Sequence, residues 1–221
     1  LPSLPPAGEV GLVSQSPGLS CTIIDYVTNA QCGFSHVIDP GFEQVLTVAD
    51  YVDMLAFDRK TRCIVLYLES FQQPRKLLSA IRLAAANKPV ILLKGGQTPG
   101  SADIVINNSG AREDEDGVMK RALVRAGALL VTSLKELNYA VQAFAMRKDL
   151  ASELKALGAK KDFDFVTQQK GMFSFSGLNP EQVQRLKDEF GVYIVKSGRM
   201  CVASLNKDNV KYTAEAIKEV L

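Results

Sequence analysis

Between Glu9 and Ala145 the sequence repeats one pattern five times, a short apolar run followed by a helical segment. The apolar runs have the length of buried strands, and the run at 64–68 is continuously apolar, as in a strand covered on both faces. Residues 48–57 carry apolar side chains at i, i+3, i+4 and i+7, the spacing of a one-sided helix. The expected strands are 9–14, 33–38, 62–69, 89–94 and 128–131, and the expected helices are 18–30, 48–57, 74–86, 113–126 and 134–144. Five such units predict an α/β fold with a doubly wound, five-stranded parallel sheet and right-handed crossovers.

The pattern changes after residue 146. The expected elements are helices at 146–157, 180–190 and 207–221 and short strands at 171–176, 193–195 and 200–203. Asn179 and Pro180 supply the cap and the first position of one helix, and Asn206 caps the last. The sequence therefore predicts two domains, 1–145 and 146–221, of which the second is a smaller α+β segment.

The charges of the chain nearly balance, with 26 Lys+Arg against 24 Asp+Glu and a formal net charge of +2. This balance predicts no basic face for nucleic acid, and no apolar run is long enough to cross a membrane. With no leader segment of the secretory kind, the expected location is the cytoplasm. The chain begins at Leu1 rather than at a Met, which indicates a piece of a longer polypeptide or a processed one.

The cysteines and the histidine limit the chemistry of the chain. The four cysteines lie far apart, without a CxxC pair, at Cys21, Cys32, Cys63 and Cys201. They are expected to be buried thiols in a reducing compartment. The single histidine, His36, cannot build a multi-histidine centre, so no metal site is expected.

Polar residues follow three of the predicted strands, at the edge where ligands gather in an open parallel sheet. They are Ser14, Gln15, Ser16 and Gly18 after the first strand, Glu69 after the third, and Lys94 at the end of the fourth. The turn at 14–18 could cradle a phosphate at the start of a helix, or Ser16 could simply cap that helix. The sequence contains no GxxxxGK[ST] motif, which excludes a P-loop.

Four blocks of the first segment carry a family resemblance. GEVGLVSQSPGLSCTIIDY (8–26), CGFSHVID (32–39), LAFDRKTRCIVLYLES (55–70) and NKPVILLKGGQTPG (87–100) resemble the second domain of NDP-forming acyl-CoA synthetases. That domain is similar to the ligase part of the succinyl-CoA synthetase α-subunit. The same module occurs in protein lysine acetyltransferases that fuse a degenerate synthetase to a GNAT domain. The resemblance covers residues 8–144 and implies a flavodoxin-like fold.

Active members of that family carry a phosphorylated histidine, and here the matching position is Asn108. Because a carboxamide is neutral and a very poor nucleophile, Asn108 cannot carry a phosphoryl group. The resemblance makes Glu69 the acid that would orient the missing histidine, although on residue type alone it is a solvated acid at a strand end. It also makes the Ser14–Ser16 turn a vestigial phosphate cradle, with Gly18 and Lys94 completing the ligand site. No residue is therefore expected to be catalytic.

The second segment resembles another family. QQKGMFSFSGL (168–178) and EFGVYIVKSGRMCVASLN (189–206) are similar to the carboxyl-terminal small domain of class I aspartate/aromatic aminotransferases, over 146–221. Arg199 matches the arginine that pairs with the α-carboxylate of the substrate, a task that suits a planar guanidinium; by residue type it reads as a surface charge. In that family the lysine, the acid and the phosphate cup that hold pyridoxal phosphate lie in the large domain. None of these motifs occurs here, and the sequences around Lys94, Lys170 and Lys196 do not match the motif of the cofactor lysine.

The resemblances imply a catalytically silent, acyl-CoA synthetase-like binding or regulatory domain of a protein lysine acetyltransferase, with acyl-CoA as ligand. One alternative is a fragment of a pyridoxal-phosphate-dependent aminotransferase with Arg199 as its carboxylate clamp. Another is a non-catalytic fusion or interaction fragment. The resemblances imply a transferase, with an acyltransferase as the first expectation and an aminotransferase as the second. The chain alone is expected to be inactive. The expected partners are Rossmann-like, ATP-grasp or GNAT domains of the parent family and a second copy of the chain, without nucleic acid or membrane.

Overall fold

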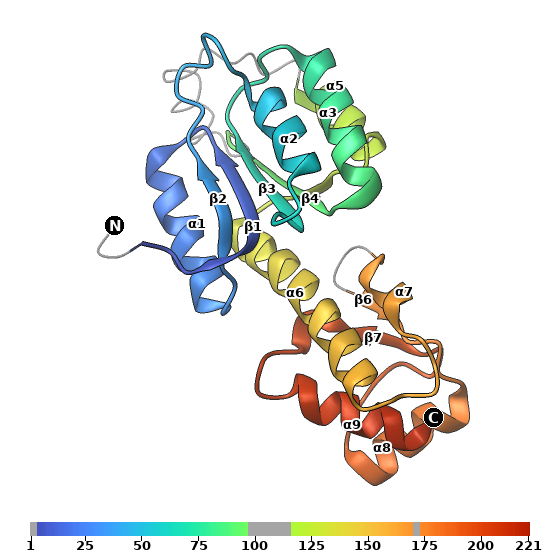
Figure 1. Ribbon diagram of the computed structural model, residues 1–221. Helices are drawn as coiled ribbons and strands as arrows, with labels where there is room; N and C mark the ends of the chain where they lie inside the picture. Colours follow the sequence, from blue (N-terminus) through green and yellow to red (C-terminus); the bar gives the residue numbers. More distant parts are fainter. Residues whose placement is uncertain (1–3, 97–115, 170–172) are drawn as a thin grey trace. The chain divides into compact units, whose positions relative to one another are not determined.

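The computed structural model describes residues 4–96, 116–169 and 173–221 (Figure 1). It divides the chain into two compact units, Leu1–Asn138, here called unit 1, and Tyr139–Leu221, here called unit 2. Among the described residues, no helix has the length and apolar character needed to cross a membrane.

Unit 1 contains one five-stranded parallel sheet. Its strands are β1 (Ala7–Ser14), β2 (Phe34–Ile38), β3 (Cys63–Leu68), β4 (Val90–Lys94) and β5 (Leu129–Val131). They lie in the order β2-β1-β3-β4-β5, and each neighbouring pair is parallel. The prediction of a flavodoxin-like, doubly wound sheet is confirmed.

Helices cover both faces of this sheet. They are α1 (Pro17–Asn29), α2 (Val48–Phe57), α3 (Pro74–Asn87) and α5 (Asp116–Arg125). The buried side chains of α2, α3 and α5 share one core with Val13, Leu66 and Leu92 of the sheet. Helix α1, whose Ile23 and Val27 are fully buried, takes no part in that core and covers the opposite face (Figure 1).

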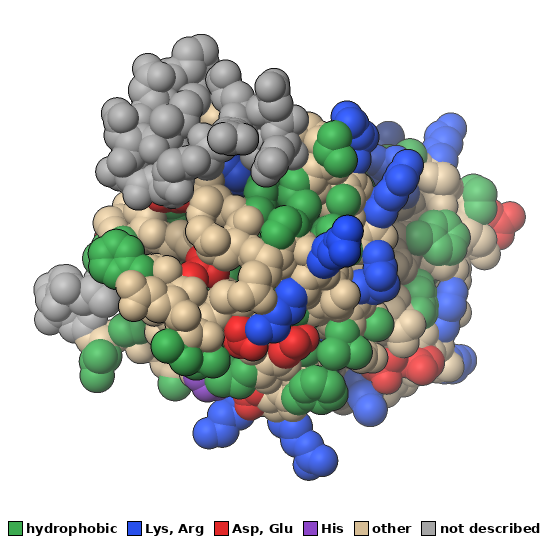
Figure 2. Space-filling model, turned by 90° about the horizontal axis from the view of Figure 1, so that it is seen from above, with side chains coloured by type: hydrophobic (Ala, Val, Ile, Leu, Met, Phe, Trp, Pro, Cys, Tyr) green, Lys and Arg blue, Asp and Glu red, His purple; other side chains and the backbone are tan. Residues whose placement is uncertain are grey.

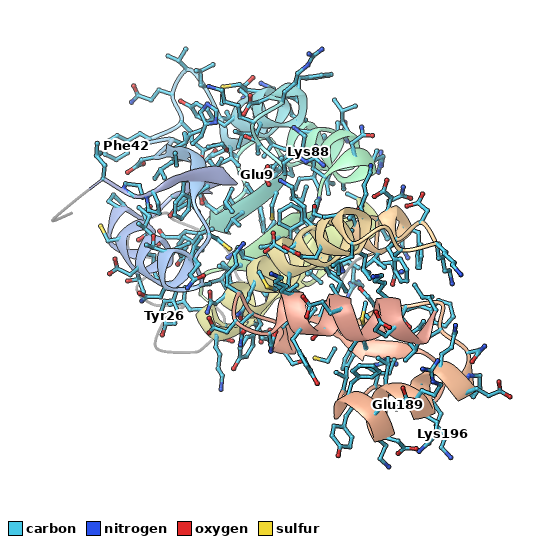
Figure 3. All side chains as sticks on the ribbon, turned by 60° about the horizontal axis from the view of Figure 1, so that its bottom comes forward. Glu9, Tyr26, Phe42, Lys88, Glu189 and Lys196 are labelled. Carbon is cyan, nitrogen blue, oxygen red and sulfur yellow. The ribbon has the colours of Figure 1, made fainter. Side chains whose placement is uncertain are left out.

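Capping residues set the helix starts. Ser16 caps α1 immediately before Pro17, and Thr47 forms a capping box with Asp50 at the start of α2. Lys88, labelled in Figure 3, donates from Nζ to the carbonyls of Leu55 and Asp58 at 2.7 and 2.6 Å. A cation at these last carbonyls stabilises the carboxyl end of α2.

Unit 2 is smaller and has little sheet. Its elements are the rest of α6 (Leu134–Ala156), α7 (Asp164–Thr167), β6 (Phe173–Phe175), α8 (Pro180–Phe190), β7 (Arg199–Cys201), a 3₁₀ turn (Val202–Ser204) and α9 (Val210–Val220). β6 and β7 pair antiparallel, and Leu150, Leu186 and Ile217 belong to a core shared by α6, α8 and α9.

Several local expectations differ from the structure. The last helix, α9, begins at Val210 after Asn209, whereas a start at 207 capped by Asn206 was expected, because the Asn206 side chain accepts from the N–H groups of Asp208 and Asn209 in the turn before the helix. Residues 202 and 203, expected in a strand, belong to the 3₁₀ turn.

The helices expected at 134–144 and 146–157 form one helix, α6, because residues 144–147 contain no Gly or Pro to end it. The two compact units divide inside α6, after Asn138, and the expected domain boundary at 145 lies in the same helix. Residues 193–195 form no strand, because β6 rather than this segment pairs with β7.

Candidate functional site

A pocket of about 520 Å³ lies where β1, β2 and β3 end. Figure 2 looks onto this end of unit 1, where hydrophobic, acidic and basic side chains lie among polar groups and backbone. The lining residues come from the loops after these strands and are Gln15, Ser16, Pro17, Asp39, Gly41, Phe42, Glu43, Glu69, Ser70 and Gln72. Because the chain leaves β1 and β3 in opposite directions, the pocket lies at the position where open α/β sheets bind ligands.

Gln15 holds the three loops together. Its Oε1 accepts hydrogen bonds from the backbone N–H groups of Glu69 and Ser70, at 2.6 and 3.0 Å. Its Nε2 donates to the Ser70 carbonyl at 3.3 Å and to the Glu43 carboxylate. The structure thus places Gln15 in the pocket as expected, but its amide is committed to bracing the walls.

Glu43 is a wall residue that the sequence did not reveal. Its second carboxylate oxygen accepts from the backbone N–H of Val48 at 3.0 Å, so the side chain links Gln15 to the start of α2. Its backbone has a positive φ of 52°, a conformation that non-glycine residues rarely adopt. Phe42, beside it, is 95% exposed at the rim of the pocket and is labelled in Figure 3.

The two serines of the expected cradle serve the start of α1. Ser14 is fully buried, and its hydroxyl donates to the Ser16 carbonyl at 3.0 Å and accepts from the Ser16 N–H at 3.3 Å. The Ser16 hydroxyl accepts from the N–H of Leu19 at 3.4 Å. This is helix capping, the simpler of the two predictions for Ser16. Gly18 is exposed and does not line the pocket.

Glu69 lies in the pocket wall and accepts a hydrogen bond from the Tyr67 hydroxyl at 3.4 Å. Burial, with a further contribution from the Glu69 charge, raises the pKa of Tyr67 to about 12, so its hydroxyl stays protonated.

Lys94 is 4% exposed, and its ammonium donates to the Gly95 carbonyl and lies 5.5 Å from the centre of the Phe71 ring. Lys94 does not line the pocket. Asn108 lies outside the described residues.

The described lining of the pocket carries negative charge. Asp39, Glu43 and Glu69 contribute three carboxylates, and none of the described lining residues is Lys or Arg. A phosphate group placed among these carboxylates would be repelled, and the N-terminus of α1 supplies only a partial positive charge against them. The described residues therefore do not fit the phosphates of a CoA ligand.

His36 lies elsewhere in unit 1. It is on β2 with Nδ1 3.5 Å from the carboxylate of Asp58. Asp58 follows α2 and precedes β3, so this pair lies toward the edge of the sheet where strands begin, opposite the pocket. Among the described residues, no cluster of His, Cys, Asp and Glu could hold a metal ion.

The cysteines are not all buried as expected. Cys32 and Cys63 are buried, whereas Cys21 is exposed and Cys201 is partly exposed. Cys21 lies on the outward face of α1, because Ser20, Ile23, Ile24 and Val27 form the buried face of that helix. Burial raises the pKa of the Cys63 thiol, which keeps it protonated and unreactive.

Unit 2 presents Arg199 at the start of β7. Its guanidinium is exposed and stacks 4.1 Å from the centre of the Phe173 ring on β6. Arg147 of α6 holds β6 from beneath, because its Nε donates to the Ser174 hydroxyl at 2.8 Å and an Nη donates to the Phe173 carbonyl at 3.2 Å. Burial lowers the pKa of Arg147 to about 10, so it stays charged at neutral pH.

Arg147 was not among the residues predicted from the sequence, although the helix pattern contains a signal for it. A single arginine stands among Ala143, Leu150 and Leu154 on the buried stripe of α6. A charge on such a stripe indicates a buried group with partners of its own.

Two family models match the chain. The family described as "Succinyl-CoA ligase like flavodoxin domain" matches residues 7–144, and "Aminotransferase class I and II" matches residues 123–217. The aspartate aminotransferase of Pseudomonas aeruginosa is 55% identical over 76 residues, which are 34% of this chain and 19% of that protein. The aromatic-amino-acid aminotransferase of Escherichia coli is 48% identical over 77 residues, 35% of this chain and 19% of that protein. The chain thus spans about a fifth of these relatives.

Solved structures share the fold. The dinucleotide-forming acetyl-coenzyme A synthetase 1 of Ca. Korarchaeum cryptofilum, in complex with phosphate and ADP, aligns with a TM-score of 0.62 at 18% identity, over 94% of this chain and 46% of that chain. Its apo form aligns with a TM-score of 0.54 at 20% identity, over 67% of this chain and 37% of that chain. Both resemblances inferred from the sequence are confirmed, and the chain belongs to the succinyl-CoA ligase-like flavodoxin domain family.

Proposed function

We propose that unit 1 is a catalytically silent acyl-CoA synthetase-like domain that serves a protein lysine acetyltransferase by binding or regulation, not by turnover. The observation that carries this proposal is the place of His36, the one histidine of the sequence. It contacts Asp58 on the side of the sheet away from the pocket. The described lining of the pocket therefore contains no imidazole that could accept a phosphoryl group, and the side-chain amide of Asn108 is too poor a nucleophile to accept one.

The contacts within the pocket also favour a binding role. Gln15 is occupied by the loops that it braces, and the carboxylate of Glu69 meets the hydroxyl of Tyr67. These groups hold the walls in place and leave no paired nucleophile and base among the described lining residues. A pocket without a nucleophile can bind a ligand but cannot form the covalent intermediate of nucleophilic catalysis.

Acyl-CoA should bind weakly. The three carboxylates of the described lining oppose its phosphates, so affinity would come from the apolar acyl and pantetheine parts against Phe42 and Pro17. Calorimetric titration of the full chain with acetyl-CoA tests this, together with an assay for free thiol released from acetyl-CoA. We expect weak heat and no thiol release. Thiol release catalysed by the chain would refute the silent role, and the absence of both heat and a thermal shift would refute acyl-CoA binding.

A second candidate function rests on unit 2, where 76 residues are 55% identical to an aspartate aminotransferase. Arg199, with its guanidinium exposed on the Phe173 ring, would pair with the α-carboxylate of an amino or keto acid. The described residues provide this arginine but no lysine, acid and phosphate cup arranged for pyridoxal phosphate, so they do not fit the cofactor. Visible absorbance of a lysine-bound cofactor after addition of pyridoxal phosphate to the full chain would favour this candidate, and its absence would remove it.

A further inference from the structure

Two neighbouring helices of unit 1 expose a row of arginines. On α3 the residues 75, 79, 82, 83 and 86 are exposed, at the spacing of one helix face, and on α5 the exposed residues 118, 121, 124 and 125 form a second face. The two helices contact each other along one side of the sheet. We call the combined surface the arginine face. It consists of the exposed Arg75, Arg82, Arg121 and Arg125 together with Leu83, Val118 and Val124, the exposed large hydrophobic residues of the same two helices.

The described residues do not neutralise the positive charge of the arginine face. Helix α3 contains no acidic residue, and α5 has one, at its first position. None of the four arginines forms an ion pair with an acidic side chain of the described residues. Lys76, next to Arg75, differs because it pairs with Asp50 of α2 at 2.7 Å. The near-neutral net charge of the chain does not reveal this face, because a sum of charges does not say where they lie.

The large hydrophobic side chains of the arginine face are open to solvent. Leu83 is 44% exposed, Val118 is 65% exposed and Val124 is 54% exposed. Arginines that can form bidentate bonds to carboxylates, interleaved with aliphatic groups, are typical of a protein-binding surface. We propose that the arginine face docks an acidic amphipathic helix of a partner protein, whose carboxylates and leucines lie on one side.

The spacing of the face suits a helix. Arg75 and Arg82 are two turns apart on α3, about 10 Å along its axis, and Arg121 and Arg125 are one turn apart on α5, about 6 Å. Carboxylates at i, i+4 and i+7 of a partner helix have the same spacings. Two packed helices also offer ridges against which a third helix can pack.

Other anionic partners fit this surface less well. A single-stranded nucleic acid would need aromatic side chains for base stacking, and the exposed large hydrophobic residues of α3 and α5 are all aliphatic. Three separated aliphatic side chains without an aromatic are also too few for insertion into a lipid interface. The proposal stands independently of acyl-CoA binding, because the arginine face shares no residue with the pocket.

The test uses fluorescence anisotropy of the full chain with a fluorescein-labelled synthetic helix that carries Glu and Leu on one face at i, i+4 and i+7. We expect saturable binding at low salt that weakens as salt is added. Replacing all four arginines of the face with Ala should weaken binding about 10-fold or more, as expected for four exposed ion pairs of ordinary strength. These positions are exposed and Ala favours helix, so the variant should fold, which circular dichroism checks.

A matched variant removes the same charge elsewhere. It carries Arg59→Ala, Lys60→Ala, Lys196→Ala and Lys211→Ala, all at exposed positions outside the face. Binding by this variant should stay within about twofold of the wild type, because none of these four residues belongs to the arginine face. An equal loss in both variants would show nonspecific attraction and overturn the proposal, as would no binding by the wild type.

Two further probes separate the kinds of partner. Leu83→Ser with Val124→Ser should weaken binding of the synthetic helix several-fold while leaving a fluorescein-labelled oligothymidylate unaffected. Tighter binding of the oligothymidylate, or of vesicles containing phosphatidylserine, than of the synthetic helix would overturn the choice of an acidic helix. So would undiminished binding of a control helix in which every Leu is replaced by Ser.

Discussion

Replacing Gln15 with Ala should destabilise unit 1 by about 2 kcal/mol, because two backbone N–H groups lose the acceptor that joins two loops. The Gln15 Oε1 atom accepts from Glu69 and Ser70 at 2.6 and 3.0 Å, and the net value of each such bond is about 1 kcal/mol. Gln15 is only partly buried, so water can reach the freed groups and keeps the cost at this level rather than higher. A change of about 2 kcal/mol alters the ratio of folded to unfolded unit 1 roughly 30-fold.

Two measurements check this prediction. Urea unfolding of the full chain should show an earlier transition for unit 1, and hydrogen exchange should accelerate at the amides of Glu69 and Ser70. Gln72→Ala is the matched control, because Gln72 also lines the pocket but is exposed. If Gln15→Ala leaves both exchange rates and the unfolding midpoint at the values of the control, Gln15 does not brace the loops.

Three further predictions concern other contacts. The pKa of Asp50 is lowered from its ordinary 3.8 to about 2, and the hydrogen bond from Lys76 is the largest cause. The ionised Asp50 carboxylate therefore stabilises the fold above about pH 4, and this stabilisation is lost as the pH falls toward 2. Asp50→Asn should therefore flatten the dependence of stability on pH in that range, as measured by urea unfolding at several pH values. Arg147→Ala should destabilise unit 2 by about 3 kcal/mol, since it leaves two acceptors on β6 without their donor, and an unchanged thermal midpoint would contradict this. A Cβ on Gly95 would lie 2.5 Å from the Tyr67 hydroxyl, so Gly95→Ala should cost about 1–3 kcal/mol and Tyr67→Phe should relieve most of it; equal costs in both backgrounds would refute the contact.

The repeating strands and helices of unit 1 could be predicted because each element signals itself locally. The continuously apolar β3 and the capping box at Thr47 are readable within a few residues of sequence. The join at residue 146 was harder, since two stretches with different charge patterns turned out to be one uninterrupted helix. Periodicity locates a helix, but only a breaker or a cap locates its end.

The walls of the pocket depended on contacts that sequence cannot supply. Gln15 and Glu43 are 28 positions apart, and nothing in either segment indicates that their side chains meet. Glu43 reaches this position through a left-handed backbone conformation that its residue type does not predict. The sequence therefore predicted that Gln15, Ser16 and Glu69 lie at strand ends, where they line the pocket, but it did not predict that Gln15 braces the pocket walls.

The central claim is that unit 1 cannot hold a phosphoryl group, and one labelling experiment tests it most directly. The full chain is incubated with acetyl-CoA and radiolabelled inorganic phosphate. In an active synthetase these would give acetyl phosphate and free CoA, and the acetyl phosphate would pass its phosphoryl group to the histidine and release acetate. We predict no acid-labile, base-stable label on the wild-type chain, because its one histidine lies with Asp58 away from the pocket. Acid-labile label on the wild-type chain, at His36 or any other residue, would contradict the account.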